Sequence, residues 1–335
     1  MEVLILLNLE TTYMGIPLKN PIVAGASALS SDMKNLKRLE FSGVGAIVVK
    51  SLFEEEIELT RFKFEEDMEK FDHIHAEMTS IYPHIDYKGT QEHLYWLTKV
   101  KNKVHVPIIA SLNAHNLETW VEYAQAIEKT GVDGLELNFY ELPQNPDTAA
   151  ATIEQEKIEV LEKVKAAVSI PVSVKLSPYY TNISNFVKRL ETAGADAVIL
   201  FNRLFQPEID IQEEEENISF DFSQSSDSLL ALRWTALLSP VFKGDIISSK
   251  GIIEGEDMIK MLLAGAQSVQ VVSTLYKNGM QQVEVLTKEL EEWMKAKDYQ
   301  KLEDFRGKMA KDHMKDPWAY ERSQYIKMLL SKENL

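Results

Sequence analysis

The sequence predicts a single (β/α)8 barrel, and three observations support this prediction. Four segments repeat the same succession of a helix end, a glycine, a short turn and an apolar strand, with the glycines at Gly43, Gly131, Gly194 and Gly265. Four further short apolar runs bring the expected strands to eight. Helical patterns alternate with these strands, and such alternation favours a closed parallel barrel.

The eight expected strands are short and almost continuously apolar, which is typical of parallel strands buried on both faces. Each repeated glycine stands where the end of a helix needs a left-handed backbone. The strands are expected at residues 21–27, 46–50, 107–112, 134–138, 171–176, 197–201, 245–249 and 268–272.

Helical periodicity predicts helices over residues 117–130, 158–168, 183–193 and 255–264. Asn116 is a start signal for the first of these, and either Thr181 or Asn182 is one for the third. An open doubly wound sheet is the alternative fold. It typically carries a glycine-rich fingerprint after its first strand, and this sequence has none there.

Three long connections, at residues 52–89, 140–152 and 203–227, follow strand ends. In a barrel they therefore lie on the C-terminal face, where barrel active sites form. Four consecutive glutamates at 213–216 predict a solvated acidic loop within the third. We expect the barrel to span residues 1–310. Residues 311–335 should form a helical tail that packs on the barrel or on a neighbouring molecule.

Composition excludes several kinds of function. A net charge of −16 and a pI near 5.0 disfavour nucleic acid and anionic membranes as partners. The absence of cysteine excludes disulfides, thiolate nucleophiles and cysteine-ligated metals, and it fits a cytoplasmic protein. The apolar run near the N-terminus is too short for a signal peptide, and no run is long enough to span a membrane.

Polar residues at the strand ends are the candidates for chemistry. Lys50 and Lys175 end two strands; each either meets an anion or carbonyl or extends to solvent. Asn113, Asn138 and Asn202 follow three others, and a ring of amides can bind the edge of a flat heterocycle. A single asparagine at a strand end is more often a turn former.

Two further features involve side chains that can ionise. Glu136 shares a strand face with Asn138 by the two-residue period, so it either points into a site or forms an internal charge paired with a lysine. His73, His75 and His84 fall in the first long connection, where the His-x-His pattern is a weak metal signal. We expect no metal site.

Together these motifs resemble the dihydroorotate dehydrogenase family, in its soluble, class 1-like form. The segment LETTYMGIPLKNPIVAGAS resembles the family's opening, in which a β-hairpin leads into the first strand. VVKS, ASLN, LELN, SVKLSPYY, SSKGIIEGEDMIKMLLAGAQSVQVVS and EDFRGKM follow in the family's order, so the likeness runs from about Leu9 to Lys308. It implies an FMN-binding TIM barrel with an N-terminal hairpin and a C-terminal helical extension.

The resemblance also implies roles for individual residues. Lys175 resembles the lysine at the flavin N1–C2 edge, where a cation stabilises the reduced flavin. Lys50 resembles the lysine beside the pyrimidine, and Asn202 a substrate-binding asparagine. The implied flavin contacts are Ala24 to Ser27, Lys50, Ser51, Asn113, Asn138 and Lys175. The implied phosphate contacts are Ser249, Lys250, Gly251, Ser273 and Thr274, and the implied substrate contacts are Lys50, Asn138 and Asn202.

The sequence departs from the family where the family carries its catalytic base. The family has a Cys or Ser in a loop like N-x-S-C-P-N, whereas this chain reads NFYELPQN over residues 138–145. Glu141 is the first candidate base, and Tyr140, assisted by Lys50, is the second; Ser80 is a third. The family's N-S-M-G substrate turn corresponds to residues 78–81, and Lys250 and Val272 replace glycines of the phosphate turns.

The resemblance implies an oxidoreductase acting on CH–CH bonds, which oxidises dihydroorotate to orotate in pyrimidine biosynthesis and transfers a hydride to flavin N5. Two alternatives stay open: an FMN barrel oxidoreductase of a different substrate, and a non-catalytic barrel that serves as a binding module. The expected partner is a small molecule, dihydroorotate or a related cyclic amide. A homodimer is compatible with the sequence.

Overall fold

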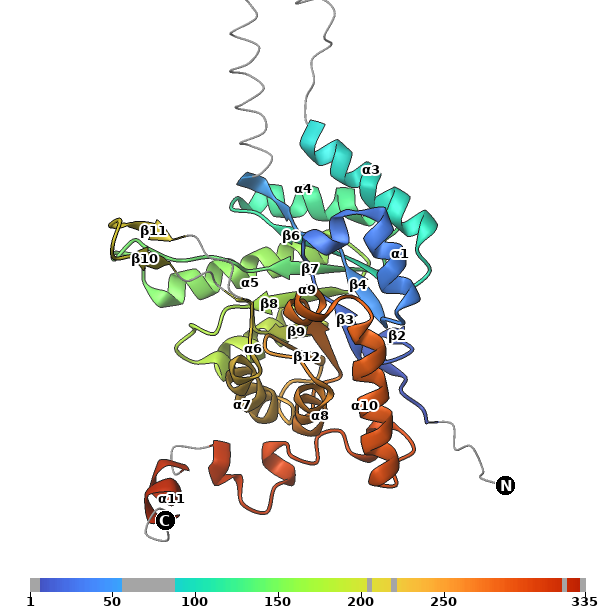
Figure 1. Ribbon diagram of the computed structural model, residues 1–335. Coiled ribbons are helices and arrows are strands. Elements are labelled where there is room, and N and C mark those ends of the chain that lie inside the picture. The colour runs from blue at the N-terminus through green and yellow to red at the C-terminus, as the bar shows by residue number, and fades with distance from the viewer. Residues whose placement is uncertain (1–6, 56–87, 204–206, 218–221, 321–323, 332–335) are drawn as a thin grey trace, which may run out of the picture.

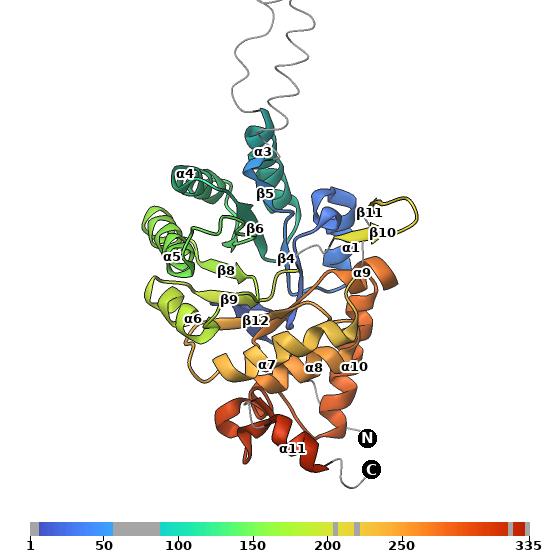
Figure 2. The same ribbon diagram turned by 90° about the vertical axis from the view of Figure 1, so that its left-hand side faces the viewer.

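Eight parallel strands close into a barrel in the computed structural model, which describes residues 7–55, 88–203, 207–217, 222–320 and 324–331 (Figures 1 and 2). Neighbours in the sheet follow the order β4-β3-β13-β12-β9-β8-β7-β6, and pairing of β4 with β6 closes the circle. The predicted barrel and all eight predicted strands are confirmed. The strands are β3 (Ile22–Ala24), β4 (Ala46–Val48), β6 (Ile108–Asn113), β7 (Gly134–Asn138), β8 (Val172–Leu176), β9 (Ala197–Leu200), β12 (Asp245–Ser249) and β13 (Ser268–Val271).

Helices surround the strands on the outside of the barrel, as Figure 2 shows. The four repeated glycines have left-handed φ values of 91°, 82°, 98° and 111° in chain order, as their motif predicts. The helices are α1 (Met33–Phe41), α3 (Lys88–Lys103), α4 (Leu117–Glu128), α5 (Ala150–Ala167), α6 (Ile183–Thr192), α7 (Ser228–Leu238), α8 (Gly255–Ala264), α9 (Ser273–Asn278) and α10 (Gln282–Ala296).

Two helix starts refine the sequence prediction. Asn182 caps α6, and its side chain accepts a hydrogen bond from the Asn185 amide, which settles the choice between Thr181 and Asn182. Helix α5 begins eight residues before the predicted 158, at Ala150. Its first two turns are largely solvent-exposed. They therefore lack the apolar stripe on which the prediction depended.

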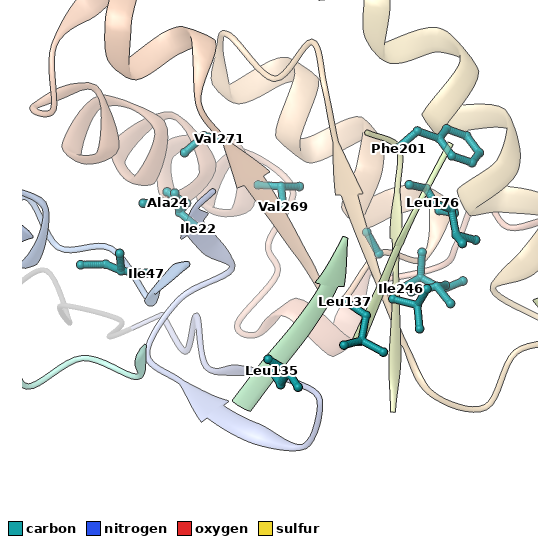
Figure 3. Packing of buried hydrophobic residues seen from close by; sticks show 14 of the residues in the cluster. Ile22, Ala24, Ile47, Leu135, Leu137, Leu176, Phe201, Ile246, Val269 and Val271 are labelled. Carbon is teal, nitrogen blue, oxygen red and sulfur yellow. The ribbon is translucent and has the colours of Figure 1, made fainter. Parts of the chain in front are cut away.

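Strand residues alternate between an outward layer and an inward layer. The outward layer packs against the helices, and Figure 3 shows part of it, including Leu135 and Leu137 of β7 and Val269 and Val271 of β13. Burying such branched side chains contributes about 1.5–3 kcal/mol each. The intervening positions, Glu136 among them, point into the barrel.

A short hairpin closes the N-terminal end of the barrel. It consists of β1 (Thr11–Tyr13) and β2 (Ile16–Leu18), which pair antiparallel. Tyr13, Met14 and Leu18 pack against inward-pointing strand residues such as Ile109. Met14 reaches the first residue of β7, where a Cβ on Gly134 would lie 2.7 Å from the methionine methyl group. The hairpin thus fills the N-terminal end of the barrel.

The third long connection contains an unpredicted hairpin, β10 (Glu208–Asp210) and β11 (Glu215–Asn217), which pair antiparallel. The solvent exposure expected for its glutamates is confirmed. The strands were missed because runs of acidic residues have low β propensity. Among the described residues, no helix is long and apolar enough to cross a membrane.

The C-terminal segment is helical, as predicted. It contains the 3-10 turns η4 (Leu302–Asp304), η5 (Lys311–His313) and η6 (Pro317–Tyr320), followed by α11 (Gln324–Ser331). Its η6 turn contacts α7, so this part of the tail packs on the barrel (Figure 1).

Glu54 fixes the short strand β5 (Leu52–Phe53) to the start of α4. Its buried carboxylate accepts hydrogen bonds from the His115 amide at 2.6 Å, from Asn116 Nδ2 at 3.0 Å and from Thr119 Oγ1 at 2.8 Å. Burial raises the pKa of this carboxyl group, but the hydrogen bonds outweigh burial and hold the pKa below its usual value.

We predict that Glu54→Gln lowers the free energy of unfolding at pH 7 by about 1–3 kcal/mol, because a charged acceptor loses several donors. A depressed carboxyl pKa stabilises the fold above the unfolded value of about 4.3. The difference between wild type and variant should therefore shrink as the pH falls below about 4. Urea titrations at several pH values measure it, with the exposed Glu122→Gln on α4 as control. A difference that stays constant from pH 7 to 3 contradicts this role.

Candidate functional site

A cavity of about 550 Å³ lies at the C-terminal ends of the barrel strands. All three long connections predicted from the sequence begin beside it. Its lining residues are Ala26, Ser27, Ala28, Lys50, Ser51, Phe53, Glu136, Asn138, Tyr140, Lys175, Phe201, Asn202, Arg203, Phe222, Ser223, Ser249, Lys250, Gly251, Ile252, Gln270, Val272, Ser273 and Tyr276.

The floor of the cavity is a buried polar layer centred on Glu136, which is fully buried. Gln270 Nε2 donates to Glu136 Oε2 at 2.5 Å, and the Tyr13 hydroxyl donates to the same oxygen at 3.1 Å. Lys175 Nζ donates to Gln270 Oε1 at 3.0 Å and lies 3.8 Å from Glu136 Oε1. Glu136 is thus both an inward-pointing residue and the ion-pair partner of a lysine.

The pKa of the Tyr13 phenol reflects the burial and the negative charge of this layer. Burial is the main cause that raises its pKa well above the usual value, and the negative charge of Glu136 raises it further. The phenol therefore stays protonated and serves as a donor to the carboxylate. The hairpin that closes the bottom of the barrel thus also stabilises Glu136, the carboxylate that pairs with Lys175.

Asparagine amides connect the strand ends above this floor. Asn202 Nδ2 donates to Asn138 Oδ1 at 2.6 Å, and both residues line the cavity. Asn113 Nδ2 donates to the Asn138 carbonyl oxygen at 2.7 Å, but Asn113 is not among the lining residues. Its contacts position the backbone of the neighbouring strand end. Beside them, the Ser51 and Ser111 hydroxyls form a 2.7 Å hydrogen bond.

Two turns, after β12 and β13, also line the cavity. Lys250 and Gly251 both have positive φ, 78° and 71°. A Cβ on Gly251 would lie 2.4 Å from the Ser228 amide nitrogen, so this turn packs too closely on α7 for a larger residue. Ser249 and Ser273 add hydroxyls beside these turns. Serine hydroxyls, main-chain amides and a lysine are groups that hold a phosphate.

Some side chains of these turns already contact other residues of the protein. Lys250 Nζ lies 3.8 Å from Asp227 Oδ1. The Ser273 hydroxyl accepts a 3.0 Å hydrogen bond from the Ser223 amide. Thr274 is fully buried, its hydroxyl donates to the Ile253 carbonyl at 3.0 Å, and it does not line the cavity.

Of the two candidate bases at residues 140 and 141, the structure places one at the cavity and the other outside it. Tyr140 lines the cavity, directly after the strand end that carries Asn138. Glu141, the first candidate from sequence, is not a lining residue, and its carboxylate forms an ion pair with Lys157 of α5. Both residues lie beyond β7, which ends at Asn138, and the Tyr140 amide donates to the Asn138 carbonyl at 2.7 Å, so the chain turns at this point. Ser27, Lys50 and Ser51 line the cavity, whereas the outward-pointing Ala24 packs in the outer layer.

Several lining residues were not predicted. Arg203 directly follows Asn202, so the strand-end rule that selected Asn202 could have selected it too. Phe222 stacks on Tyr276 with ring centroids 5.2 Å apart. Phe222 carried no sequence signal, because it reaches the cavity only when the long connection folds back onto α9.

Some predicted residues cannot be placed. Residues 78–81, with Ser80, and the three histidines His73, His75 and His84 lie outside the described residues. Within the described part of the chain, no group of three or more histidine, aspartate or glutamate side chains could hold a metal ion.

Comparison with known proteins decides the family. The dihydroorotate dehydrogenase family model matches residues 85–294. The chain belongs to the dihydroorotate dehydrogenase family. The resemblance found in its motifs is therefore confirmed.

Individual relatives are distant but cover most of the chain. The dihydroorotate dehydrogenase B (NAD(+)) catalytic subunit of Anoxybacillus flavithermus is 30% identical over 274 residues, covering 79% of this chain and 84% of that protein. The corresponding Thermoplasma volcanium protein is 26% identical over 312 residues, covering 90% and 98%. Dihydroorotate dehydrogenase A (fumarate) of Lactobacillus helveticus is 26% identical over 304 residues, covering 85% and 94%.

Family membership makes this chain a dihydroorotate dehydrogenase-family oxidoreductase, and that family depends on FMN. The residues around the cavity fit this cofactor. A flat ring can lie above the buried Lys175, and the two turns offer phosphate-binding groups.

Proposed function

We propose that this protein is an FMN-dependent dehydrogenase that oxidises dihydroorotate to orotate in pyrimidine biosynthesis. The observation that carries the proposal is the cavity itself. A buried lysine lies on its floor, and paired amides and serine- and lysine-bearing turns line it above. One cavity can therefore hold a flavin ring, its phosphate and a flat amide substrate.

Bound FMN would supply the hydride acceptor at flavin N5. Lys175, held by Gln270 and Glu136, would place a fixed positive charge at the ring's N1–C2 edge. Ser249, Lys250, Gly251 and Ser273 would bind the phosphate. These residues bind and orient the cofactor, and they are positioned by rigid strand ends.

The substrate side needs hydrogen bonds and a proton acceptor. Asn138 and Asn202 would bind the ring amides of the substrate, with Lys50 beside them. We propose that Tyr140, instead of Glu141, takes the proton from the substrate carbon, because Tyr140 lines the cavity and Glu141 is paired with Lys157 outside it.

A second candidate function is oxidation of a different organic substrate by the same flavin. The loop at residues 138–145 favours it, because a tyrosine stands near the position where the family carries Cys or Ser. Anaerobic mixing with dihydroorotate separates the two candidates. Bleaching of the bound flavin supports the first; a stable oxidised spectrum supports the second or a non-catalytic binding module.

We predict that the purified protein carries FMN, because the cavity offers one phosphate site and no glycine-rich dinucleotide fingerprint follows the first strand. Heat-released cofactor, separated by chromatography, identifies it. Recovery of FAD alone, or of no flavin after expression with excess riboflavin, contradicts the proposal.

We predict that Tyr140→Phe slows flavin reduction by dihydroorotate by about 10²–10⁴-fold, the usual contribution of general acid–base catalysis. FMN should stay bound, because the phenol is not one of the phosphate contacts. Stopped-flow absorbance under anaerobic conditions measures the rate. Glu141→Gln is the matched control, one residue away, and should retain most of the rate. Equal rates in wild type and Tyr140→Phe would exclude Tyr140 as the base.

A further inference from the structure

The ion pair on the floor of the cavity is held open. Lys175 Nζ lies 3.8 Å from Glu136 Oε1, whereas an ammonium in direct contact with a carboxylate lies at about 2.8 Å. Within the described part of the chain, Glu136 Oε1 has no hydrogen-bond partner, although the residue is fully buried. Lys175 donates instead to the side-chain carbonyl of Gln270, at 3.0 Å. A neutral amide therefore accepts this donor, although a charged acceptor lies close by.

Gln270 contacts both members of the ion pair. Its Nε2 donates to Glu136 Oε2 at 2.5 Å, while its Oε1 accepts the hydrogen bond from Lys175. Only this orientation of the amide suits both neighbours, since the reverse would place Nε2 against the ammonium and Oε1 against the carboxylate. An aliphatic side chain could bond to neither group, and a carboxylate would repel Glu136. A glutamine offers the donor and the acceptor that the two charges require.

The carboxylate and the amide are each positioned without the help of Lys175. Gln270 lies in β13, which pairs with β12 on one side and with β3 on the other. Glu136 lies in β7, and its Oε2 accepts a 3.1 Å hydrogen bond from the Tyr13 hydroxyl of the closing hairpin. Lys175 belongs to a third strand, β8. The spacing between the two charges is therefore set by the strands of the barrel and by the amide that joins them.

We propose that Gln270 is a positioning residue that separates Lys175 from Glu136 and so keeps the lysine charge effective at the cavity. In direct contact, the two opposite charges would largely cancel at a flavin ring several ångströms away. With the amide bonded to both, the ammonium keeps more of its attraction for the negative charge of a reduced flavin. This inference rests on the proposed function for the presence of a flavin above Lys175.

The test is a double-mutant cycle on the midpoint potential of the full-length, FMN-loaded protein. Gln270→Met keeps the length of the side chain but removes both hydrogen bonds, so Lys175 should close on Glu136. The equilibrium constant for flavin reduction should then fall roughly tenfold, a shift of about −30 mV for a two-electron couple. In the Glu136→Gln background no carboxylate remains to close on, so Gln270→Met should change the same constant by less than about twofold. Gln125→Met is the control, since Gln125 is exposed on α4.

A crystal structure of Gln270→Met gives a second readout that needs no flavin. The distance from Lys175 Nζ to Glu136 Oε1 should shorten from 3.8 Å to about 2.8 Å. If this variant does not fold, Gln270→Asn repeats both measurements, because its shorter amide cannot reach both partners.

Three results would overturn the proposal. A potential that is unchanged or raised in Gln270→Met excludes an effect on the lysine charge. An equal fall in the wild-type and Glu136→Gln backgrounds shows that Gln270 acts independently of Glu136. A distance that stays at 3.8 Å shows that other contacts hold the pair open. Absence of bound FMN counts against the proposed function instead, while the distance in the variant still decides the role of Gln270.

Discussion

The site depends on one buried carboxylate inside the barrel. Glu136 is fully buried, and an isolated charge there would cost several kcal/mol. Tyr13 from the closing hairpin and Gln270 from β13 donate to it, and Lys175 from β8 lies 3.8 Å away. Four parts of the chain, β1, β7, β8 and β13, therefore meet around this carboxylate. The fold that satisfies Glu136 also fixes a lysine at the floor of the cavity.

This polar layer separates the packed N-terminal end of the barrel from the cavity at its C-terminal end. Below the polar layer, the hairpin packs against inward-pointing aliphatic residues. Above it, strand ends carry amides, serines and further cations around about 550 Å³. Because Glu136 offsets only part of the positive charge, the cavity stays attractive to anions. A phosphate at the turns after β12 and β13 would lie within this positive field.

The barrel was predictable because its signals are local. Glycine after each helix and apolar runs of strand length depend on neighbouring residues alone, and so do the strand-end positions of Lys50, Lys175 and Asn202. Other features depend on long-range folding. The choice between Glu141 and Tyr140 as the candidate base depends on the ion pair of Glu141 with Lys157, which no local sequence pattern indicates. Phe222 lines the cavity because a long connection folds back, and no local pattern indicates that. Arg203 had a signal, its position after Asn202, that was not used.

The midpoint potential of the bound FMN tests the central claim that Glu136 and Lys175 set the charge beneath the flavin. Lys175→Met should lower the potential by roughly 30–60 mV, equivalent to a charged hydrogen bond of about 1.5–3 kcal/mol in a two-electron couple. Glu136→Gln should raise it, because the opposing negative charge is removed. Redox titration of both variants beside wild type gives the two shifts in one series. Opposite shifts of these signs support the account. A potential that stays unchanged or rises in Lys175→Met would contradict it.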